Sequence, residues 1–132
     1  MEDGKQDALM RRPEDALQRV PVPPERIVTP VADLFETGDA FIMKLDMPGT
    51  AKECIHLSIE SDRLAIRASV AVPHPASAHV LFSEIGHKKY LREFNLGDGI
   101  DRDKIDALYE DGVLTILLPK TEALRPRTIP IR

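Results

Sequence analysis

The placement of proline most constrains what this chain can fold into. Five of the 11 prolines fall within the first 30 residues, and none occurs between Ala76 and Leu118. Proline cannot donate to a sheet ladder and disrupts helix interiors, so the proline-free stretch should hold regular structure. We therefore expect an N-terminal arm at residues 1–30, a packed domain at residues 31–120 and a C-terminal tail at residues 121–132.

Short runs of alternating apolar and polar residues fill the expected domain. Ile55, Leu57 and Ile59 alternate with polar residues, which is the signature of a half-buried strand. Pro48-Gly49 and Asp111-Gly112 are turn pairs. Residues 113–118 are apolar on both faces, which predicts a central strand covered on both sides. Closely spaced strands without helical spacers favour an all-β fold, an immunoglobulin-like antiparallel β-sandwich with flexible N- and C-terminal arms.

The charge and hydropathy of the chain exclude several functional classes. The net charge is −4, whereas a nucleic-acid-binding domain should show a basic face. No apolar run approaches the roughly 18–20 residues that a membrane span needs. We therefore expect no nucleic-acid partner and no membrane span. The charged N-terminus lacks the apolar segment of a secretory signal, and the single Cys54 fits a reducing compartment, so we expect a cytoplasmic location.

Signals for catalysis or metal binding are weak. The chain has no phosphate-binding loop of the Gly-x4-Gly-Lys-Ser/Thr type. Cys54 and His56 share a strand face by parity, but an exposed polar face explains the pair better than a nucleophile with its base. His74, His79 and His87 lie in or beside the proline loop without a visible set of converging ligands. We expect no enzymatic activity, no metal and no cofactor.

The loop at residues 69–83 contains no acid, lysine or arginine, and its prolines prevent a continuous strand. Near its end stand three consecutive apolar residues, Val80, Leu81 and Phe82. An uncharged apolar loop would be an aggregation liability if it were left in water.

The tail closes with Ile129-Pro130-Ile131. Residues two apart point the same way in an extended chain, and Pro130 favours extended geometry. Two isoleucines on a polar tail cannot build a core there, so they suit a groove. Burying both would contribute about 3–6 kcal/mol before ordering costs. The residues alone leave two alternatives open: docking on a neighbouring copy, or folding back onto the tail's own domain.

Several short motifs follow one another in a specific order. They are Val31-x-Asp33-Leu34-x-Glu36, Asp46-Met47-Pro48-Gly49, Leu64-x-Ile66, Glu84-x5-Tyr90-x-Arg92-x-Phe94-x-Leu96, Ala107-x4-Gly112-Val113-Leu114 and Leu118-Pro119-Lys120. With the Ile-x-Ile tail, they resemble the small heat-shock proteins, which are built around the alpha-crystallin domain. The resemblance runs from about residue 31 to residue 131.

The resemblance implies an ATP-independent holdase chaperone. Such a protein binds partly unfolded client proteins under stress and keeps them refoldable by ATP-driven chaperones. It also implies self-association, in which dimers assemble into larger homo-oligomers.

The resemblance also implies sites for assembly. Ile129, Pro130 and Ile131 would dock into a groove of a neighbouring domain, between two strands and above a third. The loop at residues 69–83 would be the dimerisation loop, with Val80, Leu81 and Phe82 crossing to the partner and adding a strand. Arg92 would pair with an acid at the dimer face. The groove would be formed by Ile55, Leu57, Ile59, Ile105, Ala107, Leu114 and Ile116.

Compared with the family, the expected client-binding arm would be short and would lack aromatic residues. Aromatic residues in the N-terminal arm are often the client contacts, but the first aromatic here is Phe35. Aliphatic residues of the arm would have to serve instead: Leu9, Met10, Leu17, Val20 and Val22.

A second interpretation is a β-sandwich binding module. It could be a co-chaperone of the CS-domain type, or an assembly factor that coats particles such as gas vesicles. CS domains generally lack both the Ala-x4-Gly-Val-Leu signature and the Ile-x-Ile plug, which favours the chaperone interpretation.

Overall fold

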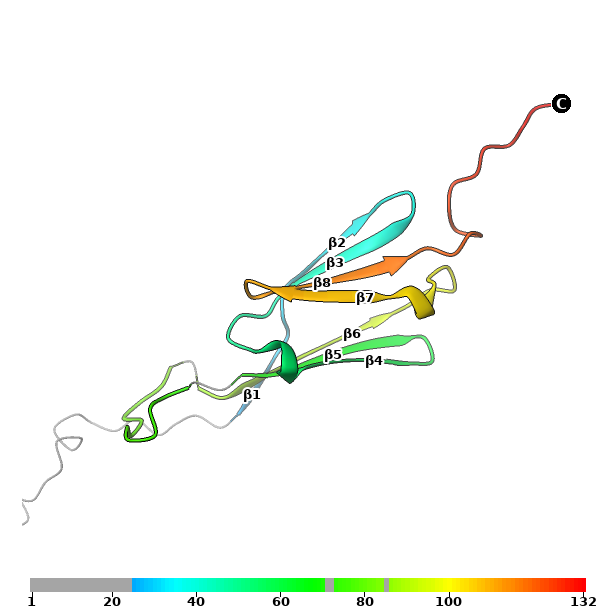
Figure 1. Ribbon diagram of the computed structural model, residues 1–132. Helices are drawn as coiled ribbons and strands as arrows, with labels where there is room; N and C mark the ends of the chain where they lie inside the picture. Colours follow the sequence, from blue (N-terminus) through cyan, green and yellow to red (C-terminus); the bar gives the residue numbers. More distant parts are fainter. Residues whose placement is uncertain (1–24, 71–72, 85) are drawn as a thin grey trace, which may run out of the picture.

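The computed structural model describes residues 25–70, 73–84 and 86–132, and its strands form two stacked sheets (Figure 1). One sheet has the order β1-β6-β5-β4, and the other has the order β2-β3-β8-β7. The strands are β1 (Arg26–Val28), β2 (Ala32–Glu36), β3 (Ala40–Asp46), β4 (Ile55–Glu60), β5 (Arg63–Val70), β6 (Lys88–Asn95), β7 (Asp106–Glu110) and β8 (Val113–Pro119). Two 3-10 turns, η2 (Lys52–Cys54) and η3 (Arg102–Lys104), precede β4 and β7. The predicted all-β sandwich is confirmed.

The core lies between the sheets and follows from the alternation in the sequence. In β5, Leu64 and Ile66 point inward and are at most 1% exposed, whereas Arg63 and Arg67 on the other face are exposed. Leu45 and Ile116 meet them from the opposite sheet as fully buried side chains. Each sheet therefore contributes one apolar face to a shared core.

The β7–β8 hairpin forms where the Asp111-Gly112 pair predicts a turn. Asp111 and Gly112 have φ angles of 53° and 77°, as a two-residue type I′ hairpin requires. Aspartate and glycine tolerate this left-handed region better than most residues, which explains their position here.

The turn after β3 is held between the two sheets by two tyrosines. The Tyr90 hydroxyl of β6 donates a hydrogen bond to the Pro48 carbonyl at 2.9 Å, and the Tyr109 hydroxyl of β7 donates to the Met47 carbonyl at 2.7 Å. Burial raises the pKa of the Tyr109 hydroxyl, and the nearby Tyr90 raises it further. The Asp-x-Pro-Gly motif is thus fixed by both layers of the sandwich.

The structure differs from the predictions at three boundaries. Arg26–Val28, which we expected in the arm, forms β1 and pairs in parallel with β6, so the sandwich is not wholly antiparallel. Strand β5 continues to Val70, so the loop begins two residues later than expected. No described part of the chain covers the outer face of β8, because Leu117 is 39% exposed and the two sheets pack through one face only. For the described residues, the prediction that residues 113–118 are covered on both sides is therefore wrong, although β8 is central in its sheet.

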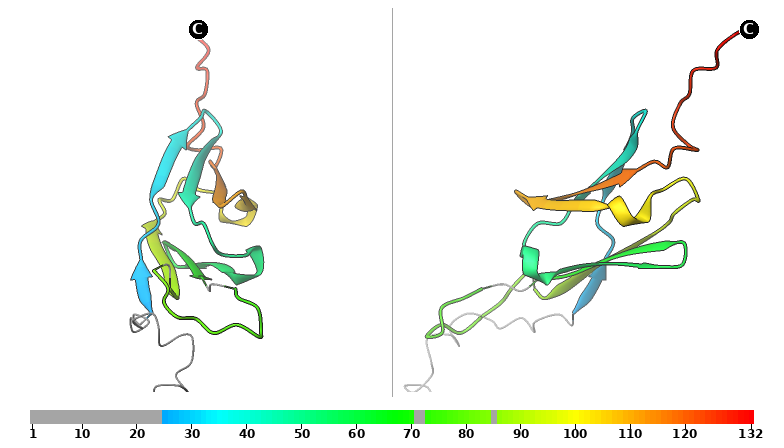
Figure 2. Two further views of the ribbon diagram at one scale, coloured as in Figure 1. Left: turned by 90° about the vertical axis from the view of Figure 1, so that its left-hand side faces the viewer. Right: turned by 45° about the vertical axis from the view of Figure 1, so that its right-hand side comes forward.

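The edge strands lie in pairs on opposite sides of the sandwich. Strands β4 and β7 end their sheets on one side, and β1 and β2 end them on the other (Figure 2). This arrangement leaves two open sides where another chain segment could bind.

Candidate functional site

The C-terminal tail leaves the domain instead of covering it (Figure 1). Its base is fixed, because the Thr121 amide donates to the Gly99 carbonyl at 2.8 Å and the Leu124 side chain lies against Gly99. Beyond this base, Ile129 and Ile131 are 83% and 98% exposed. Of the two alternatives left open by the sequence, this geometry favours docking on a neighbouring copy.

The predicted groove residues lie on and beneath the β4 and β7 edges. Ile55, Leu57 and Ile105 are half-buried against the core, and Ile59 is partly exposed. The remaining three groove residues are Ala107, which is exposed, and Leu114 and Ile116, which are buried. The last two belong to the core and can serve only as the floor beneath the edges.

The apolar segment of the loop forms no strand within this chain. Val80 and Phe82 are exposed, and Leu81 is half-buried. Val80 and Phe82 line a cavity of about 300 Å³ together with the three loop histidines, which are His74, His79 and His87. Within the described residues, no three histidine, cysteine or acidic side chains are arranged to hold a metal ion.

Arg92 lies on the inward face of β6, between Tyr90 and Phe94 in the alternation. Its guanidinium donates a hydrogen bond to the Pro30 carbonyl at 2.8 Å and stacks over the Phe94 ring at 4.9 Å. Pro30 is fully buried where the chain passes from β1 to β2. Arg92 therefore tethers this crossing, and its pairing with an acid at a dimer face remains a prediction.

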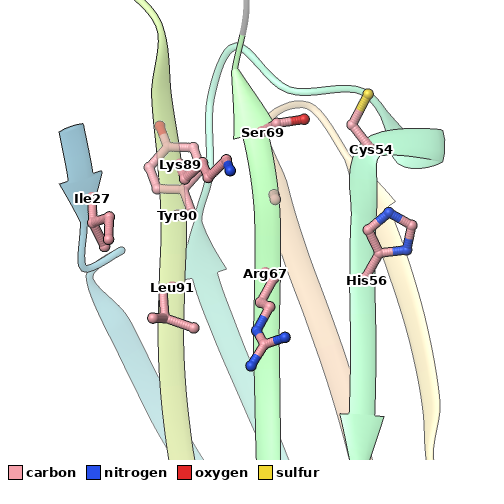
Figure 3. Close-up of a pocket in the computed structure, with 9 residues that line it drawn as sticks. Ile27, Cys54, His56, Arg67, Ser69, Lys89, Tyr90 and Leu91 are labelled. Atoms are coloured by element: carbon pink, nitrogen blue, oxygen red, sulfur yellow. The ribbon is translucent and has the colours of Figure 1, made fainter. Parts of the chain in front are cut away.

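A hollow of about 400 Å³ lies on the outer face of the β1-β6-β5-β4 sheet (Figure 3). Cys54 and His56 both line it, but only His56 belongs to strand β4, because Cys54 lies in the preceding 3-10 turn η2. The other side chains around it include Arg67, Lys89, Ile27 and Leu91. No hydrogen bond joins Cys54 to His56 among the described residues, so the geometry offers no activated nucleophile.

The sequence analysis missed an ion pair between a buried lysine at the end of β8 and an exposed glutamate of β2. Lys120 is 5% exposed, and its ammonium lies 2.8 Å from the Glu36 carboxylate and 5.0 Å from the centre of the Phe41 ring. Lysine is rarely buried unless it is paired. The Leu-Pro-Lys motif marked the position, but its acidic partner is 84 residues away along the chain.

The expected client-contact residues all belong to the arm. Leu9, Met10, Leu17, Val20 and Val22 lie outside the described residues. In the part of the chain that the structure describes, no helix is long and apolar enough to cross a membrane.

Comparison with known proteins identifies relatives over most of the chain. An 18 kDa antigen of Mycobacterium avium is 34% identical over 108 residues, which cover 82% of this chain and 73% of that protein. Heat shock protein 16.0 from Schizosaccharomyces pombe has a similar fold, with a TM-score of 0.63, 27% identity, and coverage of 80% of this chain and 99% of that one. A small heat-shock protein from Xylella fastidiosa, described with a distinct high-order structure, gives a TM-score of 0.59, 26% identity, and coverage of 80% and 94%.

The family comparison agrees with these relatives. Residues 33–132 match the model of the Hsp20/alpha crystallin family. This match includes both sheets except for β1 and the first residue of β2, Ala32, and it includes the tail. The sandwich, the ordered motifs and these similarities together lead to one conclusion: the chain belongs to the Hsp20/alpha crystallin family of small heat-shock proteins.

Proposed function

We propose that this protein is an ATP-independent holdase chaperone of the cytoplasm. It binds partly unfolded proteins, prevents their aggregation and leaves them to ATP-driven chaperones for refolding. The observation that supports this best is the pair of exposed isoleucines on a tail that starts from a fixed base. Such a tail is suited to linking copies of one chain, and family membership supplies the chaperone context.

Assembly beyond the dimer would use the tail and the β4–β7 side of a neighbouring copy. Ile55, Leu57 and Ile105 are apolar residues there that remain only half-buried within their own chain. Ile129 and Ile131 would cover them, and each contact gains strength from the many equivalent contacts in a symmetric assembly. The high-order structure named for the Xylella fastidiosa relative supports an assembly of this kind.

The dimer would form when the loop segment of one chain adds to strand β2 of its partner. Strand β2 is an edge strand, and its Leu34 and Phe35 are at least half exposed. In an added strand, Val80 and Phe82 would face one way and Leu81 the other. These side chains would cover both faces of the apolar edge that β2 leaves open.

The experiment that tests the chaperone function is a light-scattering assay of a heated, thermolabile client enzyme without ATP. We expect the protein at an equimolar subunit ratio to suppress most of the scattering. The control is an equal mass of an unrelated soluble protein, which should leave the scattering unchanged. Equal scattering with and without this protein would contradict the proposal.

A further inference from the structure

The hollow on the outer face of the β1-β6-β5-β4 sheet takes no part in the assembly contacts proposed above. It spans all four strands at the end of the sheet where β1 begins (Figure 3). The groove for the tail lies at the β4–β7 side, and the loop segment would add to β2. The hollow is therefore a separate surface.

The lining of the hollow combines positive charge with apolar walls. Arg67 and Lys89 contribute the cations, and Ile27 and Leu91 contribute apolar side chains, of which Ile27 is 70% exposed. Within the described residues, Arg67 takes part in no ion pair. A peptide with acidic and aliphatic residues close together has the complementary chemistry.

The N-terminal arm joins the domain at the rim of this hollow. Glu25, the first described residue, pairs with Lys89 at 3.7 Å, and Ile27 in β1 forms one wall. The preceding sequence contains Glu14 and Asp15, followed by Leu17. Glu25 follows Leu17 by eight residue steps, and an extended chain of that length spans about 26 Å, which exceeds the roughly 14 Å across four neighbouring strands.

We propose that residues 13–22 of the arm dock in this hollow on the same chain. Glu14 and Asp15 face Arg67 and Lys89, and Leu17 covers the apolar wall formed by Ile27 and Leu91. The occupant is thus the arm itself, and the ion pair between Glu25 and Lys89 is the contact that leads the arm onto the sheet.

The only cysteine in the chain lines the hollow and reports whether it is covered. The measurement is the rate at which N-ethylmaleimide, an uncharged thiol reagent, labels Cys54 in the full-length protein. The double variant with Glu14→Lys and Asp15→Lys should raise this labelling rate about fivefold, as expected when two exposed ion pairs are lost. The matched control, Glu2→Lys with Asp3→Lys, makes the same charge change nearer the chain start and should leave the rate unchanged.

A disulfide test separates docking on the same chain from docking on a neighbour. Leu17→Cys combined with Cys54→Ser and Leu91→Cys should form a disulfide under mild oxidation, because the proposal places residue 17 against Leu91, and the product should keep the single-chain mass on a non-reducing gel. As a control, Leu17→Cys is combined with Cys54→Ser and Glu60→Cys, which puts the thiol at the far end of β4, two strands away from Leu91, and should not cross-link.

Several results would overturn the proposal. Equal labelling rates in the Glu14/Asp15 variant and the unchanged protein would show that the arm does not cover the hollow. A disulfide-linked dimer would assign the hollow to the arm of a neighbouring copy. If Ile129→Ala with Ile131→Ala unmasked Cys54 instead, the occupant would be the tail. None of these results depends on client binding, so failure here is distinct from failure of the chaperone proposal.

Discussion

Removing both isoleucines from the tail should dismantle the assembly without harming the domain. In the double variant Ile129→Ala with Ile131→Ala, each substitution removes three carbons from a side chain that is at least 83% exposed in the single chain. At about 0.8 kcal/mol for each buried CH₂-sized group, full burial of both side chains corresponds to a loss of about 5 kcal/mol per tail. Burial of half that area corresponds to about 2.5 kcal/mol, or a roughly 70-fold weaker contact.

The assay for this variant is size-exclusion chromatography with multi-angle light scattering over a range of concentrations. We expect the unchanged protein to elute as a large oligomer and the double variant as dimers or small species. The thermal unfolding midpoint of the domain should hardly change, because exposed substitutions usually alter stability by no more than about 0.5 kcal/mol.

The matched control is Thr128→Ala, which is adjacent to Ile129 but faces the other way in an extended tail. It should leave the oligomer intact. Unchanged elution of the double isoleucine variant would refute the docking role of the tail. Dissociation of the Thr128 variant to the same extent would show that the tail acts without the proposed side-chain alternation.

Three further predictions concern the loop, the buried Lys120 and the tyrosine contacts. The double variant with Leu81→Asp and Phe82→Asp should convert dimers to monomers in native mass spectrometry. The control His79→Asp, which puts a charge on the same loop, should leave the dimer intact. If the double variant stayed dimeric, the interface would lie elsewhere. Lys120→Ala should lower the free energy of unfolding by about 1–3 kcal/mol, because it removes the buried partner of Glu36, and the exposed Lys44→Ala serves as the control in the same denaturant titration. Tyr109→Phe leaves the Met47 carbonyl without its hydroxyl donor and should lower stability by about 1 kcal/mol at neutral pH. Since the folded protein holds the pKa of Tyr109 above its ordinary value, the unfolded chain loses this proton first, and stability should fall as the pH rises above about 10. Denaturant titrations between pH 8 and 11 should show a smaller fall for the Phe variant, and equal slopes would contradict this explanation.

The strands could be predicted from the sequence because their signals are local. The alternation at Ile55, Leu57 and Ile59 corresponds to β4, and the Asp111-Gly112 pair corresponds to the β7–β8 hairpin. Strand β1 was missed because three residues between prolines carry no period, and the strand depends on pairing with β6, about sixty residues away.

Contacts between distant residues account for the part of the candidate site that could not be predicted. The sequence marks Arg92 and Lys120 as motif residues, but it does not show that one binds the Pro30 carbonyl and the other the Glu36 carboxylate. These partners depend on how the two sheets stack. The exposed outer face of β8 was missed for the same reason, since an apolar run does not reveal whether a second layer covers it.

The fixed base of the tail has a consequence for the architecture of any assembly. The contact of Leu124 with Gly99 and the hydrogen bond from Thr121 set the point from which the tail departs. From Arg125 to Ile131 the chain can extend only about 20 Å, at roughly 3.3 Å per residue. The tail therefore acts as a tether of limited length, and the permitted separation and orientation of neighbouring subunits narrow accordingly. Substitutions at Gly99 would displace the Leu124 side chain and free the base of the tail. They should therefore broaden the distribution of subunit numbers, although Ile129 and Ile131 remain able to dock.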